Sequence, residues 1–222
     1  MSANQLLLAL GHRAARARED FLVADSNAAA VAWVDRWPDW PGPGLALYGA
    51  AGCGKSHLAH VFAARSDARV VGPEAIQSAA VPGLLTDRTA WAIDDADRNC
   101  DERGLLHFLN AIAEQRGHVL LTARAAPARW AVALPDLASR LAAMPAVAIA
   151  PPNDALLAAV LVKLFADRQL MIGVDVIDYL TGRIERSFAA ASAMVERLDR
   201  AALAERRAVT VPLVRRVLDT AP

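Results

Sequence analysis

Apolar and polar positions follow two different patterns along this chain. Over residues 21–150, short continuous apolar runs typical of buried strands alternate with segments of helical spacing. Beyond Pro151 and Pro152 only helical spacing remains. Alternating strands and helices are typical of a doubly wound parallel sheet, so the pattern predicts an α/β domain over 21–150. The segment 151–222 is then a smaller all-helical second domain of about 70 residues, and 1–20 a terminal peptide and linker.

The expected elements can be placed by residue number. Segment 21–27 fits a short strand or an extended turn, in which Ser26 or Asn27 could cap the next helix. Thr210 could cap the last helix in the same way. The predicted strands of the α/β domain are 45–48, 68–71, 89–95, 118–122 and 146–149. The predicted helices are 28–37, 57–64, 73–80, 104–115, 134–144, 154–168, 175–182, 187–207 and 212–218.

Composition excludes several classes of function. The 24 basic and 24 acidic residues give a formal net charge of zero, so the chain has no electrostatic footprint for tight autonomous DNA binding. Cys53 and Cys100 are the two cysteines, which cannot form a disulfide framework and fit a reducing cytoplasm. The apolar run 6–10 is too short for a signal peptide or a membrane span. The five histidines show no metal-ligand spacing.

Residues 49–56 read GAAGCGKS and match G-x-x-x-x-G-K-[ST] at every fixed position. A strand-type run precedes them and a helical run follows, as a phosphate-binding loop requires. The glycines allow backbone N–H groups to point at phosphate, Lys55 would reach the β- and γ-phosphates, and Ser56 would ligate Mg²⁺. The alternative is a glycine-rich turn with a chance lysine. The expected nucleotide contacts are Gly49, Ala51, Gly52, Cys53, Gly54, Lys55, Ser56 and His57.

A second candidate lies at the end of the apolar run 89–93, where Asp94 and Asp95 follow directly. Ligands of parallel sheets gather outside the carboxyl ends of the strands. Asp94 can therefore hold a Mg²⁺ shell with Ser56, and Asp95 can polarise an attacking water. The alternative is a strand that runs into a polar turn.

The extreme N-terminus carries an apolar hexamer, QLLLAL at 5–10. Exposed leucines gain nothing in a free segment unless they are buried on something. They either enter a pocket of a partner or fold back on their own domain, and composition alone leaves both open. The residues of a partner-binding peptide would be Gln5, Leu6, Leu8 and Leu10.

The phosphate loop, the Asp-Asp strand, a third strand ending in Thr122 and the helical C-terminal region together resemble the AAA+ ATPases. Within them the chain is similar to the family of the replication initiator DnaA and its short regulators. The most telling stretch is 134–141, LPDLASRL, where that family carries its arginine finger on Ser-Arg. The resemblance makes Arg140 this finger, puts Asp25 near the adenine within segment 21–27, and gives Asp94 and Asp95 their metal and water-polarising roles.

The resemblance also implies partners. The hexamer 5–10 is similar to the peptide with which a short member of the family binds the DNA polymerase sliding clamp, which favours partner binding over folding back. The expected protein binds ATP or ADP with Mg²⁺ and docks on the clamp. It stimulates ATP hydrolysis by DnaA through Arg140 and so prevents re-initiation. It would act in the cytoplasm, at the nucleoid through the clamp. The sequence stops at Pro222 with no helix-turn-helix domain, so no direct sequence-specific DNA binding is expected.

Two positions depart from the family pattern. Arg124 follows the third strand where an acidic residue is usual, and Ala189 falls where a nucleotide-sensing lid arginine is expected, with Arg186 one turn earlier as a substitute. Both weaken the case for vigorous ATP turnover in the chain's own site and leave binding intact. Three alternatives stay open: an autonomous AAA+ ATPase, an adaptor that localises DnaA without stimulating hydrolysis, and, for Arg140, a merely solvated arginine. Homo-oligomer formation is also left open.

Overall fold

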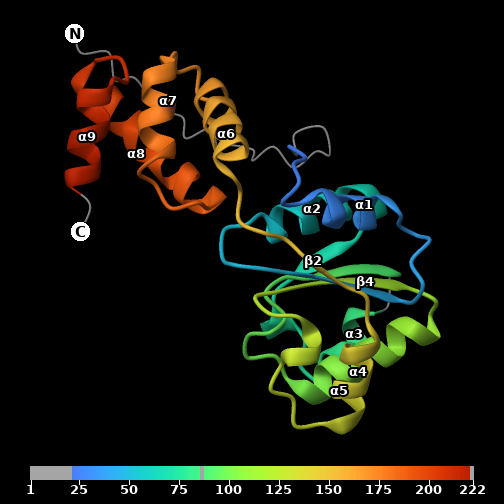
Figure 1. The fold of residues 1–222 in the computed structure, drawn as a ribbon. Helices are drawn as coiled ribbons and strands as arrows, with labels where there is room; N and C mark the ends of the chain where they lie inside the picture. The colour runs from blue at the N-terminus through green and yellow to red at the C-terminus, as the bar shows by residue number, and fades with distance from the viewer. Residues whose placement is uncertain (1–21, 86–87, 221–222) are drawn as a thin grey trace.

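The computed structural model describes residues 22–85 and 88–220 of the chain. Five parallel strands form one sheet in the order β2-β3-β4-β1-β5. They are β1 (Gly44–Tyr48), β2 (Arg69–Val71), β3 (Ala90–Ile93), β4 (His118–Ala123) and β5 (Ala146–Ala148). Helices lie on both sides of this sheet (Figure 1). The doubly wound parallel α/β fold predicted from the pattern is confirmed.

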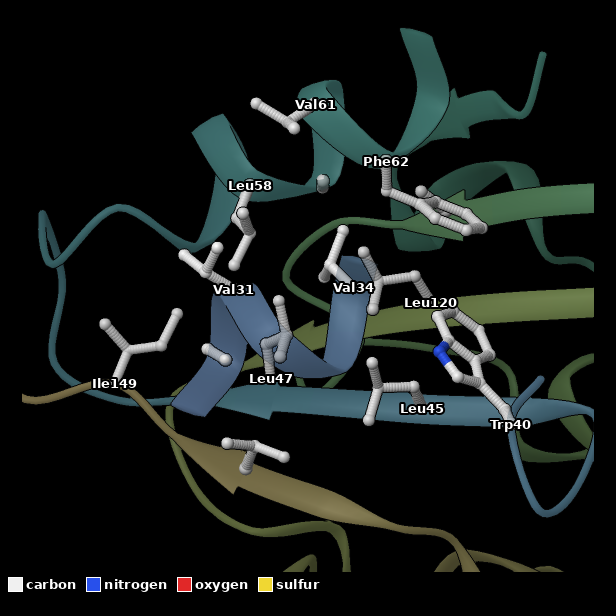
Figure 2. Packing of buried hydrophobic residues seen from close by; sticks show 14 of the residues in the cluster. Val31, Val34, Trp40, Leu45, Leu47, Leu58, Val61, Phe62, Leu120 and Ile149 are labelled. Carbon is white, nitrogen blue, oxygen red and sulfur yellow. The ribbon is translucent and has the colours of Figure 1, made fainter. Parts of the chain in front are cut away.

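Helices cover both faces of the sheet because side chains of successive strand residues point to opposite faces. On one face, Leu45 and Leu47 pack with α1 (Ala28–Asp35) and α2 (Lys55–Ser66), as Figure 2 shows. On the other, Ala46 and its neighbours pack with α3 (Val81–Leu84), α4 (Glu102–Glu114) and α5 (Pro135–Ala143). Strands buried on both sides explain the continuous apolar runs in the sequence.

An aromatic cluster closes the first of these faces near the amino ends of the strands. Trp40 stacks on Phe62 with ring centroids 5.3 Å apart, and Trp37 meets the same ring edge-on at 6.0 Å. Both tryptophans also meet the imidazole of His118 edge-on. The cluster anchors the segment that leads from α1 into β1.

The C-terminal helices are α6 (Asp154–Ala166), α7 (Val174–Thr181), α8 (Phe188–Glu205) and α9 (Val211–Asp219). They share a hydrophobic core of their own, which includes Leu161, Phe165 and Leu198. Figure 1 shows this helical unit joined to the sheet by the segment after β5. Among the described residues, no helix has the length and apolar character needed to cross a bilayer.

Three local predictions need correction. The helix predicted at 73–80 is wrong: the segment forms one turn of 3-10 helix, η2 (Pro73–Ala75), followed by the unpredicted α3. Tertiary hydrogen bonds from the backbone and hydroxyl of Ser78 to Asp101, at 2.8 and 2.6 Å, draw this chain out of helical geometry. Residues 25–27 form a turn, which is one of the two structures that the sequence allowed for segment 21–27. Asn27 and Thr210 do occupy N-cap positions, but neither side chain bonds to its helix.

Candidate nucleotide site

The loop between β1 and α2 has the backbone that a phosphate cradle needs. Gly52 and Gly54 adopt left-handed φ angles of 71° and 104°, which side chains with a Cβ rarely tolerate. At Gly49 a Cβ would lie 2.2 Å from the carbonyl oxygen of Ile149. The three glycines of the loop, two of them fixed by the motif, therefore meet steric requirements that only glycine satisfies.

Lys55 begins α2 and is 6% exposed. Its Nζ donates to the carbonyl oxygens of Gly49 and Ala50 at 3.0 and 2.9 Å, and lies 3.9 Å from the Sγ of Cys53. The loop thus curls around the ammonium group. A buried charge is retained only when it is well paired, and phosphate oxygens are stronger partners for an ammonium than neutral carbonyls are.

Three elements meet at the next part of the site. The Oδ1 of Asp94, after β3, accepts a hydrogen bond from the Oγ of Ser56 in α2 at 3.0 Å and one from the Oγ1 of Thr122 in β4 at 2.5 Å. Hydroxyl and carboxylate oxygens are the ligands that Mg²⁺ prefers, and it usually takes one or two from protein and the rest from phosphates and water. Ser56 and Asp94 therefore fit a Mg²⁺ ion held together with a nucleotide. No group of three or more His, Cys, Asp or Glu side chains suited to a metal occurs within 22–85 and 88–220.

Thr122 is a residue of the site that the sequence prediction did not include. Besides Asp94, its Oγ1 contacts the backbone N–H of Asp95, which donates to it at 2.9 Å. Asp95 takes a left-handed φ of 53°, and its carboxylate lies 3.4 Å from the Arg98 guanidinium. Thr122 thus holds both aspartates in place. The sequence feature that could have predicted this role is a hydroxyl residue near the end of the strand that follows the Asp-Asp pair.

The predicted adenine-side turn lies at the same edge of the sheet. Asn27 is buried and closes the turn, accepting from the N–H of Ala24 and donating to the carbonyl of Leu22, both at 2.9 Å. Asp25, in the turn, is exposed. The N–H of Ala150 donates to the carbonyl of Ser26 at 3.0 Å, which ties the turn to the segment that leaves β5.

The helical unit reaches the phosphate loop through the start of α8. The N–H of Phe188 donates to the carbonyl oxygen of Gly52 at 2.7 Å. Ala189 follows in the first turn of this helix, while the Arg186 guanidinium is bonded to both carboxylate oxygens of Asp154 at 2.9 and 3.1 Å. In this structure a main-chain hydrogen bond therefore joins the lid to the loop.

Arg140 lies on α5 and is not in contact with the phosphate-loop residues. Leu137 and Leu141 bury the inner side of the helix, and Arg140 is exposed. No hydrogen bond or ion pair joins its guanidinium to any other residue that the structure describes. Arg124 is also exposed, and its backbone N–H donates to Asp97 at 2.7 Å. The predicted peptide residues Gln5, Leu6, Leu8 and Leu10 lie outside the described residues.

Known proteins resemble this chain in the sequence of the lid and in the overall fold. Residues 154–218 match the family model described as Hda, lid domain. Domain III of the Thermotoga maritima replication initiation protein DnaA is similar with a TM-score of 0.79 at 16% identity, over 92% of this chain and 95% of that one. AMPPCP-bound DnaA from Aquifex aeolicus is similar with a TM-score of 0.64 at 18% identity, and the match covers 80% of this chain and 63% of that one. The Thermotoga maritima RuvB branch migration motor is similar with a TM-score of 0.64 at 14% identity, and the match covers 80% of this chain and 61% of that one.

The parallel sheet with its phosphate loop and helical lid defines a P-loop protein with the AAA+ fold. More particularly, residues 154–218 are similar to the lid domain of Hda, and the likeness to domain III of DnaA shows that this chain shares the DnaA fold.

Proposed function

We propose that this protein is a nucleotide-dependent regulator that supplies Arg140 to the ATP bound by DnaA and thereby limits re-initiation of replication. The observation that carries the proposal is that Arg140 is exposed on α5 and has no partner within the described residues. The match of residues 154–218 to the Hda lid domain supports it. A guanidinium placed against the charge that develops in phosphoryl transfer accelerates GTPases by about 10³ to 10⁵.

The helix that carries Arg140 is well fixed, which is what a residue acting on another molecule requires. Leu137 and Leu141 anchor α5 in the core. The Glu102 carboxylate, at the start of α4, accepts the N–H groups of Ala133 and Leu134 at 2.9 to 3.0 Å. Both N–H groups immediately precede α5, so the entry to this helix is fixed as well. Only the guanidinium itself is left unrestrained.

We propose that the chain's own site holds ATP or ADP with Mg²⁺. The phosphates would lie in the loop of residues 49–56, close to Lys55, and the ion between Ser56 and Asp94. The turn with Asp25 would face the base, and Asp95 would orient a water for whatever hydrolysis the site supports. This bound nucleotide would keep the lid and the α/β part, divided at residues 151–152, in one arrangement.

The N-terminal peptide, with Gln5, Leu6, Leu8 and Leu10, is proposed to dock on the DNA polymerase sliding clamp. Its support is the sequence pattern alone. Docking there would bring the protein to newly replicated DNA without any sequence-specific DNA contact of its own, and it would act in the cytoplasm, at the nucleoid.

The test is ATP hydrolysis by DnaA with clamp loaded on DNA. Wild-type protein should stimulate hydrolysis, Arg140→Ala should not, and a Gln5→Ala/Leu8→Ala variant should lose both stimulation and clamp pull-down. Arg103→Ala, an exposed arginine on the neighbouring α4, is the matched control and should stimulate like wild type. Stimulation that survives Arg140→Ala would contradict the role of the finger, and binding to DnaA without stimulation would indicate an adaptor.

A second candidate, an autonomous ATPase, is favoured by the joined Ser56, Asp94 and Thr122 side chains. It predicts ATP turnover by the purified protein alone, abolished by Lys55→Ala. The same assay without DnaA distinguishes the two candidates.

A further inference from the structure

The first turn of α8 makes a close contact with the phosphate loop. The carbonyl oxygen of Gly52 accepts the N–H of Phe188 at 2.7 Å. A Cβ on Gly52 would lie 2.7 Å from the Cβ of Ser187 and 3.2 Å from that of Ala189, and one on Gly54 would lie 3.1 Å from the Phe188 ring. The loop and the helix can approach this closely only because the loop has glycines here.

The geometry of the peptide bond gives this contact a consequence inside the loop. In a trans peptide, the C=O of one residue and the N–H of the next point in opposite directions. The bond that holds the Gly52 carbonyl toward the lid therefore turns the N–H of Cys53 to the opposite side, away from the lid. An accepted hydrogen bond also polarises the peptide and makes that N–H a stronger donor.

We propose that the Phe188 amide is a latch that holds the lid on the phosphate loop, positions the Cys53 N–H for a phosphate, and slows the release of bound nucleotide. The inference rests on the proposed nucleotide binding and extends it. In this chain the lid would sense the nucleotide through a main-chain bond. Ala189 has no charge to offer, and the Arg186 guanidinium is paired with Asp154.

The position of Phe188 allows a direct test. It is the first residue of α8, where proline is well tolerated, and the preceding Ser187 has φ −143° and ψ 147°, in the extended region that precedes proline. Phe188→Pro removes the N–H and the ring, whereas Phe188→Ala removes only the ring. The difference between these two variants therefore isolates the latch.

The measurement is the dissociation rate of a fluorescent ADP analogue from the full chain by stopped flow. Phe188→Pro should release the analogue about tenfold faster than Phe188→Ala, with similar association rates, because one hydrogen bond has been lost. Equal dissociation rates in the two variants overturn the latch. If the wild-type protein fails to bind the analogue at all, the proposed nucleotide binding itself fails, and the latch with it.

A measurement on the wild-type protein covers the case in which the proline variant does not fold. The first N–H groups of a helix have no partner inside it and exchange rapidly with solvent unless something else accepts them. The Phe188 amide should therefore be protected from hydrogen exchange, and more strongly so with ADP present. An amide that exchanges at the rate of an open helix end, with and without ADP, overturns the latch.

Discussion

Lys55 and Arg140, the two cations on which the proposed function depends, are held in opposite ways. Lys55 is buried, and its ammonium group is bonded to two carbonyls of its own loop. Arg140 is exposed and unpaired among the residues that the structure describes, although its helix is firmly anchored. A group that serves a ligand of its own chain can be restrained in advance, whereas a group offered to another molecule has to remain accessible. Substitutions at the two places should therefore have different effects.

The largest effect is expected from Lys55→Ala. It removes the cation from the phosphate loop, and nucleotide affinity should fall on the order of 100-fold, the equivalent of about 3 kcal/mol for a bond between charged groups. Isothermal titration calorimetry with ADP checks this. Lys163→Ala, which changes the chain's other lysine, on the lid helix α6, is the control and should bind ADP like wild type.

Gly49→Ala tests whether the surroundings of the loop restrain it. The new methyl group would be 2.2 Å from the carbonyl oxygen of Ile149, so either the loop or the segment after β5 has to move. Overpacking of this kind costs about 1–3 kcal/mol of unfolding free energy. Denaturant titration should show the loss, whereas Gly42→Ala, with no neighbour within 4 Å of the new Cβ, should leave stability close to that of wild type.

Asp101→Asn tests how the start of α4 is fixed to the segment around Ser78. Hydrogen bonds from the side chain and then the backbone of Ser78 lower the pKa of Asp101 from 3.8 to about 2. Because the folded pKa is the lower one, this stabilisation is complete well above pH 3.8 and is lost as the pH falls toward 2. Wild type should therefore have the higher melting temperature at neutral pH, and its advantage over Asp101→Asn should shrink in acid. An advantage that does not change with pH would contradict this role.

The smallest effect on the isolated protein is expected from Arg140→Ala. With no partner to lose among the described residues, the variant should keep its unfolding free energy within about 0.5 kcal/mol and bind ADP like wild type. Denaturant titration and calorimetry check both. A clear loss of stability would mean that the fold uses Arg140, and the contrast with Lys55 would disappear.

The sequence predicted the strands well because buried parallel strands leave continuous apolar runs, and the phosphate-loop motif identified the glycines and Lys55. It failed at 73–80, where spacing alone could not reveal that Ser78 bonds to Asp101, a residue 23 positions away. Cap residues show the same limit. Asp101, Asn153 and Ser187 accept N–H groups of their helices, whereas Asn27 uses its amide to close the preceding turn.

The candidate site shows where prediction from sequence stops. Ser56 and Asp94 could be paired in advance because the carboxyl ends of parallel strands meet at one edge. Thr122 was missed as a bridge between two aspartates, and so was the bond from Phe188 to Gly52, because each depends on how segments far apart in sequence approach one another. The exposure of Arg140 likewise follows from which side of α5 packs on the core.

The stacked Trp40 and its neighbours make the two parts of the molecule optically distinct. All five tryptophans precede residue 150, so no tryptophan emission comes from the lid. Tryptophan fluorescence, excited at a wavelength that Tyr179 of the lid does not absorb, will therefore report melting of the sheet and its covering helices, while circular dichroism in the amide region reports both parts. Two curves that separate on heating would show that the lid unfolds on its own, and curves that merge when ADP is added would show that nucleotide makes the two parts cooperative.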